Sequence, residues 1–546
     1  MSTIQRRKKM KHLDLFTDLA PFYNLKELVN VSSNRYQEEG AYRFERNREI
    51  VSISYSRFKT EVEALSTYIY SLGINKANLA VIGENSYEWI VSYFATVYSG
   101  NVIVPLDRDL TAEETRNLIV DSSSEILFYS DTYEDIIYYL KESCPSVKYF
   151  IPFSSYLELI EKGLELIASG VTAALEVDID KDSLAAIIYT SGTTGKPKGV
   201  MLSHNNLASN TVSCRHFVKV RGNSMMVLPM HHSFGFTTCV LYYLYTGSEL
   251  CINRSLKRIK DDFLRYKPYN VFMVPLIVES VYRKIWDGAT EKGKDKLLRT
   301  MIPISNGLRK IGIDLRKILF KSVVAEFGGN FEYIITGGAP INDEYIKGLC
   351  DLGIDTVNGY GITECSPVVS VNRLGNNKIG SAGPVYTCCV VKIADPDEDG
   401  LGEILVKGDN VMLGYYNNPT ATAEAFEDGW FKTGDIGYLD KDNFIYITGR
   451  KKSMIVLSNG KNIFPEELEG LIVRELPYVA EALVYSKDSV LTAEVYIEPE
   501  KVEEFASQLD EDIRKMNANL VPYKRILKTV RRDIEFEKTT TKKIKR

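Results

Sequence analysis

The run YTSGTTGKPKGVMLSH, from Tyr189 to His204, directly follows the apolar, strand-like run LAAII. Its sixteen residues include three glycines, two lysines and five Ser or Thr hydroxyls. Glycines let successive backbone N–H groups turn toward one ligand, while hydroxyls and lysines add donors and positive charge. The pattern therefore predicts a loop that wraps an anion at the end of a strand. The plain alternative for such a composition is a surface hairpin.

This run does not match the Walker P-loop, GxxxxGK[ST]. Thr190 stands where the first glycine is required, and Pro197 follows Lys196 where Ser or Thr is required. Proline also removes a backbone N–H at the point where a P-loop begins its helix. A P-loop NTPase, which releases ADP and phosphate, is therefore disfavoured.

Strands and helices alternate through the first third of the chain. Asn85 and Thr111 are expected to cap helices, with Glu88 and Glu114 as capping-box partners. Buried strands are expected at LAVIG (79–83), VIVPLD (102–107), ILFYS (126–130), VFMVP (271–275) and EYIITGG (332–338). This alternation predicts an α/β fold, with a large N-terminal domain of doubly wound, mainly parallel sheets.

The pattern changes after about residue 380, where short strands joined by Gly- and Asp-rich turns predict a β-rich section. A helix led by Pro465, two strands and a helix near residues 500–517 then predict a small α+β domain. We expect an N-terminal domain over 1–449, a hinge over 450–452 and a C-terminal domain over 453–546.

Composition limits the remaining classes. A chain of 546 residues is too long for one core, and its net charge of −5 gives no reason to expect nucleic acid as a partner. Eight cysteines without a CxxC pair favour a reduced, cytoplasmic compartment. No apolar run approaches the roughly 18 residues of a membrane span. A basic run near the N-terminus, from Arg6 to Lys11, could touch an anionic membrane, although a solvated terminus is favoured.

Several motifs together give the chain a family resemblance. TSGTTGKPKGV (190–200) resembles the signature of the adenylate-forming, AMP-binding superfamily, which includes acyl-CoA synthetases, luciferase-like enzymes and adenylation domains of peptide synthetases. Further motifs follow in the family's order: LPMHHSFGF (228–236), ITGGAPI (335–341), NGYGITECSP (358–367), KTGD (432–435), TGRKKS (448–453) and SNGKNIFPEELE (458–469). The resemblance extends over residues ~80–546.

The resemblance implies a MgATP site. Tyr360 would stack on adenine, Thr363 would meet the α-phosphate, and Glu364 would hold Mg²⁺. Asp435 would accept the two ribose hydroxyls. The implied ATP-binding residues are Thr190, Ser191, Gly192, Thr193, Gly195, Lys196, Gly338, Ala339, Pro340, Tyr360, Gly361, Thr363, Asp435 and Arg450.

It also implies a carboxylate site and an acceptor site. His232 matches the histidine that lies beside the bound carboxylate, and Thr194 of the loop is the second expected catalytic residue. His231 and Phe236 are expected toward the acyl pocket. Lys452 matches the hinge at which the small domain swings, and Gly460 would let the pantetheine arm of CoA pass.

The last motif departs from the family's pattern. The family usually ends in PKTxxGKxxR, whereas this chain ends EKTTTKKIKR. Glu537 replaces the proline and Lys542 replaces the glycine, so the alignment leaves Lys543 as the catalytic lysine. The alternative is a basic, frayed tail.

The resemblance therefore implies an AMP-forming acid–thiol ligase. The motifs most resemble those of synthetases for medium- and long-chain fatty acids. The carboxylate of such an acid would attack the α-phosphate of ATP, and CoA would then take the acyl group. Chain length, a preference for aryl acids and oligomeric state stay open. An acyl-carrier-protein ligase, which would use an acidic carrier as its partner, and a non-catalytic nucleotide-binding homologue are the alternatives.

Overall fold

The computed structural model describes residues 19–190, 197–220, 222–456, 462–487, 490–538 and 544. The chain divides into two compact units. The large unit contains residues 1–390 and 406–431, and the small unit contains residues 391–405 and 432–546. The large unit is α/β and the small unit mixes helices with further sheets, which confirms the expected fold class.

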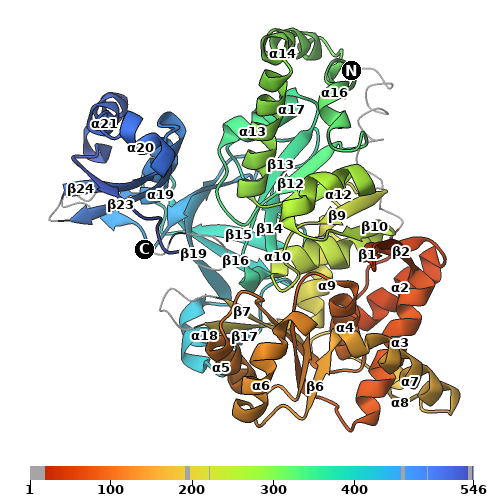
Figure 1. The fold of residues 1–546 in the computed structure, drawn as a ribbon. Coiled ribbons are helices and arrows are strands. Elements are labelled where there is room, and N and C mark those ends of the chain that lie inside the picture. Colours follow the sequence, from red (N-terminus) through yellow and green to blue (C-terminus); the bar gives the residue numbers. More distant parts are fainter. Residues whose placement is uncertain are drawn as a thin grey trace. The chain divides into compact units, whose positions relative to one another are not determined.

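The strands that flank residues 191–196 belong to a seven-stranded sheet in the large unit (Figure 1). Its order is β17-β8-β7-β4-β3-β5-β6, and the strands from β7 to β6 are parallel. The strands are β3 (Asn78–Ile82), β4 (Val102–Leu106), β5 (Ile126–Tyr129), β6 (Tyr149–Pro152), β7 (Leu184–Thr190), β8 (Lys198–Ser203) and β17 (Gly414–Tyr415). Helices α4 (Tyr87–Tyr98), α5 (Ala112–Ser122) and α6 (Glu134–Ser143) alternate with β3, β4, β5 and β6.

An eight-stranded sheet forms the other half of the large unit. Its order is β14-β13-β12-β11-β9-β10-β1-β2, and the strands from β13 to β1 are parallel. The strands are β1 (Gly40–Arg46), β2 (Glu49–Ser54), β9 (Asn223–Met226), β10 (Glu249–Ile252), β11 (Asn270–Met273), β12 (Tyr333–Thr336), β13 (Asp355–Gly361) and β14 (Val368–Val371). Two largely parallel sheets confirm the expected doubly wound architecture.

The strands β7 and β8 that flank residues 191–196 pair antiparallel, from Leu184↔Ser203 to Thr190↔Lys198. The loop therefore returns the chain to the same sheet as a neighbouring strand. A P-loop would instead lead from a strand into a helix. The topology agrees with the argument from Pro197 against a P-loop NTPase.

The helix caps show where local sequence signals succeed and where they fail. Thr111 caps α5, and Glu114 completes the capping box as predicted. The cap of α4 is Ser86, not Asn85, so that prediction was wrong by one residue. The Asn85 amide instead donates to the carbonyl of Leu228 at 2.7 Å, and its oxygen accepts from the N–H of Met230 at 3.0 Å.

The small unit begins in a five-stranded sheet that crosses the unit boundary. It consists of β15 (Cys389–Ala394), β16 (Gly402–Gly408), β19 (Trp430–Leu439) and β18 (Phe426–Glu427), with β20 (Ile445–Arg450) paired to β19. This sheet is the expected β-rich section. The hairpin pair β21 (Ile455–Val456) and β22 (Asn462–Ile463) follows.

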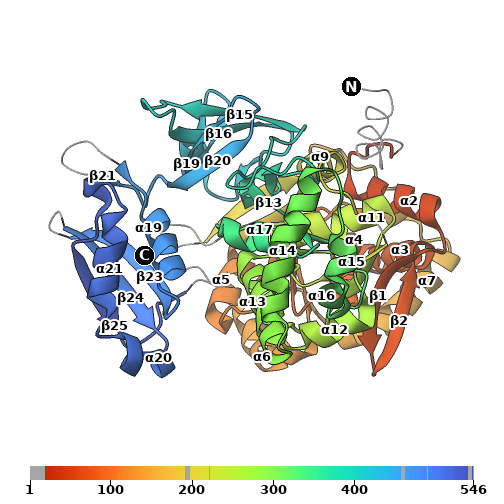
Figure 2. The ribbon, with the colours of Figure 1, turned by 90° about the horizontal axis from the view of Figure 1, so that it is seen from above.

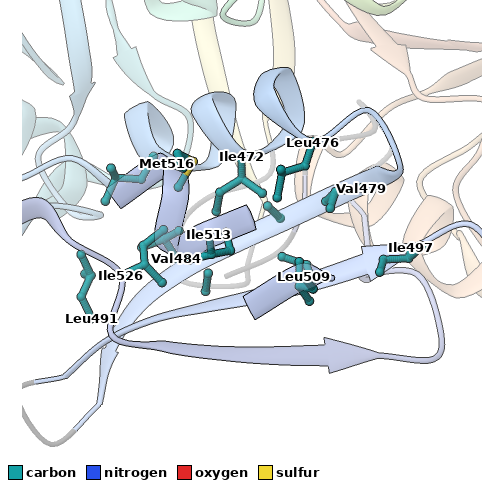
Figure 3. Close-up of a cluster of buried hydrophobic side chains, with 14 of the residues drawn as sticks. Ile472, Leu476, Val479, Val484, Leu491, Ile497, Leu509, Ile513, Met516 and Ile526 are labelled. Atoms are coloured by element: carbon teal, nitrogen blue, oxygen red, sulfur yellow. The ribbon is translucent and has the colours of Figure 1, made fainter. Parts of the chain in front are cut away.

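The last part of the small unit is an α+β domain with its own core. A three-stranded sheet of β23 (Val479–Lys487), β24 (Val490–Ile497) and β25 (Lys528–Arg532) packs with α19 (Pro465–Glu475), α20 (Pro499–Phe505) and α21 (Leu509–Ala518). Figure 3 shows Ile472, Val484 and Ile513 meeting in that core. The single helix expected near residues 500–517 is two helices.

The expected hinge begins at Arg450, the last residue of β20, and continues into the turn that follows it. The two compact units divide the chain at other positions, because residues 391–405 and 432–449 group with the small unit. The domain boundaries at 449 and 453 stay predictions. Within the described residues, no helix is both long enough and apolar enough to cross a membrane.

His204, the first residue of α9 (His204–Cys214), gives the fold an expected acid sensitivity. Its Nδ1 accepts from the N–H of Leu25 at 3.2 Å, and burial lowers the pKa of His204 to about 4. The unfolded chain takes up this proton near pH 6.5, so the native state loses stability as the pH falls from 6.5 to 4. We expect His204→Asn, whose amide oxygen can still accept from Leu25, to remove about 2–3 kcal/mol of the difference in unfolding free energy between about pH 7 and pH 4.5. Urea unfolding of both proteins at both pH values measures this, and equal differences would contradict it.

Candidate active site

The motifs after β9, β12 and β13 meet at one edge of the eight-stranded sheet. These strands run parallel through β11, so their carboxyl ends lie at the same edge. Ligands of open α/β sheets bind beyond the carboxyl ends of the strands. LPMHHSFGF follows β9, and GGAP follows β12, while GYGITE begins within β13 and continues beyond it.

A hydroxyl pair joins two of these motifs directly. Oγ of Ser233 lies 3.1 Å from Oγ1 of Thr363, although 130 residues separate them in the chain. His232 is the residue before Ser233 and occupies the N-cap position of the short helix α10 (Ser233–Gly235), without a capping hydrogen bond from its side chain. His232, which is expected beside the carboxylate, is therefore the neighbour in sequence of a residue that contacts Thr363, which is expected beside the α-phosphate.

Glycines allow close packing at this edge. A Cβ on Gly361 would lie 2.1 Å from the carbonyl oxygen of Pro367, and one on Gly337 would lie 3.2 Å from that of Gly359. Gly338 has a φ of +85°, in the region that favours glycine. The run from Gly338 to Pro340 is exposed, so its backbone is open to a flat ligand.

A small apolar cavity of about 40 Å³ begins beside these glycines. Tyr360 lies on its wall and is 8% exposed. Further wall residues are Phe234, Thr238, Phe272, Ile335 and Val371. The walls are mainly apolar, as in small-molecule sites, but the cavity is far smaller than the roughly 300–1,000 Å³ of such sites.

Glu364 is oriented by a partner from the other sheet. The Tyr415 hydroxyl donates to Oε1 of Glu364 at 2.9 Å, and the Glu364 carbonyl accepts from the N–H of Met412. Burial and, after it, the charge of Glu364 raise the pKa of Tyr415 well above its usual value, so the hydroxyl keeps its proton. Tyr415 pairs with Val200 of β8, and Nζ of Lys198 lies 4.9 Å from the Tyr415 ring. Glu364 is thus tied to the strand that leaves the anion loop.

The donor set around Glu364 fits a magnesium ion. Mg²⁺ is a hard cation that binds one or two carboxylates together with phosphate oxygens and water. The carboxylate of Glu364 is partly exposed, and the hydrogen bond from Tyr415 engages Oε1. Oε2 is the oxygen that would then face a cation.

His231 and His232 lie beside the end of β4. Nε2 of His231 is 3.3 Å from Oδ1 of Asp107, without the alignment of a hydrogen bond, and the two histidine rings are 4.2 Å apart. His231 is 7% exposed. The Asp107 carboxylate therefore sets the charge environment of the histidine pair, and the Asn85 clamp on the preceding backbone holds that pair in place.

Phe236 lies in an aromatic cluster. It is 3% exposed in the π-helix η3 (Phe236–Leu241), and its ring stacks on Tyr93 of α4 with centroids 3.8 Å apart. The ring of Trp89 lies 5.7 Å away. Phe234 is the residue of this motif that lines the cavity, so the acyl-pocket role of Phe236 stays a prediction.

In the small unit, Asp435 and Arg450 form an ion pair across β19 and β20. Nε of Arg450 lies 2.8 Å from Oδ1 of Asp435, whose side chain is 5% exposed. Gly434, with a φ of +70°, precedes Asp435, and its N–H donates to Glu403 at 3.1 Å. The role of this buried carboxylate as an acceptor for ribose hydroxyls stays a prediction from KTGD.

Other predicted residues are placed only in part. Thr190 ends β7, and its hydroxyl lies 3.5 Å from the carbonyl of Lys198. Lys452 is exposed in the turn after β20. The residues Ser191, Gly192, Thr193, Thr194, Gly195, Lys196, Gly460 and Lys543 lie outside the described residues. Their roles stay predictions.

Sequence reasoning missed four residues of this site: Asp107, Ser233, Phe234 and Tyr415. Asp107 carried a usable signal, because it is a carboxylate at the end of the buried strand VIVPLD. Ser233 and Phe234 lie inside a motif that was recognised only for its histidines and Phe236. Tyr415 gave no signal, because its role depends on pairing between distant strands.

Comparison with known proteins agrees with this geometry. The family model of the AMP-binding enzyme matches residues 30–416, and that of the AMP-binding enzyme C-terminal domain matches residues 452–546. The long-chain-fatty-acid–CoA ligase FadD15 of Mycobacterium bovis is 30% identical over 468 residues, which cover 81% of this chain and 77% of that protein. The chloroplastic long-chain-fatty-acid–[acyl-carrier-protein] ligase AEE15 of Arabidopsis thaliana is 28% identical over 562 residues. The match covers 88% of this chain and 76% of that protein.

A solved structure shows the same fold. O-succinylbenzoate coenzyme A synthetase (MenE) from Bacillus subtilis, in complex with ATP and magnesium ion, matches with a TM-score of 0.73 and 23% identity. The match covers 95% of this chain and 98% of that chain. Because the larger family model alone matches well over half of the chain, this protein belongs to the AMP-binding enzyme family.

Proposed function

We propose that this protein activates a fatty acid with MgATP to an acyl-adenylate, and then transfers the acyl group to CoA. The first step releases pyrophosphate, and the second yields acyl-CoA and AMP. The observation that carries this proposal is the contact between Ser233 and Thr363. It puts the motif expected beside the carboxylate next to the motif expected beside the α-phosphate, which are the two groups that react.

Charge compensation explains the residue types at the site. A carboxylate that approaches ATP meets a polyanion, so positive charge and N–H donors must be in place before reaction. The glycine-rich loop with Lys196, the hydroxyl of Thr363 and the C-terminal Lys543 would supply these donors. Glu364 would hold the Mg²⁺, which neutralises phosphate charge when bound. His232 would orient the acid through one of its oxygens.

The walls of the cavity support an apolar acid. Phe234, Phe272 and Ile335 contribute hydrocarbon surface, whereas an α-amino group would need an anionic partner. The relative from Mycobacterium bovis is named as a long-chain-fatty-acid ligase. We therefore propose a medium- or long-chain fatty acid as substrate, with an aryl acid as the next candidate.

We propose that the two half-reactions use two arrangements of the small domain. We propose that one brings Lys543 to the phosphates, and that rotation at Lys452 then brings the Gly460 segment and CoA. Lys538 and Ile544 pair in an isolated β-bridge in the small unit.

The acceptor has a second candidate, an acyl-carrier protein. The relative from Arabidopsis thaliana is named as a ligase of this type, and the C-terminal face is basic, as a partner of an acidic carrier would be. All eight cysteines are free thiols in the structure, which fits the proposed reduced, cytoplasmic compartment. That compartment is compatible with either acceptor.

Carboxylate-dependent exchange of pyrophosphate into ATP, without CoA, tests the proposed function. Fatty acids of increasing length and several aryl acids are compared, and CoA or carrier protein is then added. We expect exchange with a limited range of fatty-acid lengths and thioester formation with CoA. ATP binding without exchange for any acid would support the non-catalytic alternative, and thioester formation with the carrier alone would support the second acceptor.

A further inference from the structure

A surface segment of the large unit, residues 292–321, carries an excess of positive charge. Residues 292–321 contain nine Lys or Arg and two Asp, in a chain whose net charge is −5. They form α14 (Asp295–Lys310), α15 (Arg316–Leu319) and the first residue of α16 (Lys321–Ala325). Both Figure 1 and Figure 2 show α14 at the surface, packed beside α13 (Pro275–Glu291).

Large apolar side chains are exposed along this segment. Leu297 and Ile304 are seven residues apart on α14, and Ile311 continues the same spacing just beyond the helix end. Their exposed fractions are 57%, 51% and 72%. Leu298 and Ser305, one position further along, are buried. The helix thus packs one face on the protein and presents an apolar stripe next to it.

Unpaired lysines accompany the stripe. Lys294, Lys296, Lys310 and Lys321 are exposed and form no ion pair with any residue in the described ranges. Several basic neighbours are instead held by carboxylates: Arg309 by Asp351, Arg316 by Asp314 and Asp355, and Lys317 by Glu332. The four lysines are therefore available to an external anion. We define the α14 surface as these four lysines with Leu297, Ile304, Ile311 and Ile318, which is 72% exposed.

The exposed apolar side chains and free lysines on and near α14 match the chemistry of a lipid interface. Such helices bury their apolar face at the boundary of headgroups and acyl chains, while Lys and Arg meet lipid phosphates. An acidic protein partner would satisfy the lysines, but it would need a groove of its own for a ridge of Leu and Ile. We propose that the α14 surface docks this protein on an anionic phospholipid bilayer. The docking itself does not depend on the proposed reaction.

Flotation with phosphatidylcholine vesicles, with and without phosphatidylglycerol, tests the proposal without ATP or a fatty acid. We expect the protein to float with the anionic vesicles, and less as salt rises. Lys296→Gln with Lys310→Gln is expected to weaken partition about 25-fold, since each lysine near an anionic surface contributes about fivefold. Ile304→Ser with Ile311→Ser should weaken it at least about tenfold, through lost apolar burial.

Matched controls separate the α14 surface from general charge and exposure. Lys76→Gln with Lys528→Gln removes the same charge elsewhere, and Tyr138→Ser with Leu527→Ser removes side chains that are each 72% exposed. These pairs should float like the wild type. Unchanged melting temperatures and unchanged pyrophosphate exchange with a water-soluble acid would show that the α14 variants are folded.

Three outcomes would overturn the proposal. One is equal flotation of the α14 variants and their controls. The second is loss of flotation only when the N-terminal Arg6, Arg7 and Lys8 are replaced by glutamine. The third is absence of vesicle binding by the wild type, including the case in which an acidic carrier protein binds the α14 surface instead. Each can occur with the exchange reaction intact, so failure here is distinct from failure of the proposed function.

Discussion

Replacing Glu364 by glutamine is expected to slow carboxylate-dependent pyrophosphate exchange by about 10²–10³-fold. Losses of this order follow the removal of one electrostatic stabiliser from a preorganised site. Glutamine keeps the size of the side chain and an oxygen that can accept from Tyr415, so the variant removes charge with little change of shape. The measurement is the exchange rate at saturating ATP and acid over a range of magnesium concentrations.

Tyr415→Phe is the matched control for this prediction. It removes the hydrogen bond at 2.9 Å but leaves the Glu364 charge, so we expect a loss of only about tenfold, in line with one hydrogen bond to a charged group. Exchange by Glu364→Gln at the wild-type rate, with the same magnesium dependence, would contradict a role for Glu364 at the metal. A larger loss for Tyr415→Phe than for Glu364→Gln would point to the hydroxyl itself.

Replacing Lys543 by alanine is expected to slow the adenylation step by about 10²–10³-fold, because a cation expected beside the α-phosphate of ATP is lost. The C-terminal run EKTTTKKIKR contains several lysines that could be the catalytic one, and the described part of the structure argues against Lys538. Lys538 pairs with Glu481 and, at 2.8 Å, with Glu535, and these two carboxylates raise the pKa of Lys538. Lys538 is therefore engaged in holding the tail.

The two half-reactions provide the test of Lys543. Pyrophosphate exchange reports adenylation, whereas thioester formation from a supplied acyl-adenylate and CoA reports the second step alone. We expect Lys543→Ala to lose the first and keep the second. Lys545→Ala, two residues away, should retain both. A loss on Lys545→Ala or Lys542→Ala with a normal Lys543→Ala would reassign the catalytic lysine in a tail whose family glycine is replaced.

Local signals predicted much of the fold. The strands near residues 79–83, 102–107 and 126–130 and the capping box of Thr111 with Glu114 were found correctly, because each depends on neighbours within a few residues. The misplaced cap at Asn85 has a simple cause. Asparagine and serine are both good N-caps and stand side by side, and only the backbone conformation at Ser86 decides between them.

The sequence by itself determined the family, the doubly wound architecture and the order of the motifs, because these depend on short runs such as TSGTTGKPKGV and on strand–helix alternation. Tertiary structure alone decided which side chains meet. Ser233 reaches Thr363 over 130 positions, Tyr415 reaches Glu364 over 51, and Asn85 reaches Leu228 over 143. Such contacts follow from strand order and from which strand ends share an edge, and neither is encoded in any local period of the sequence.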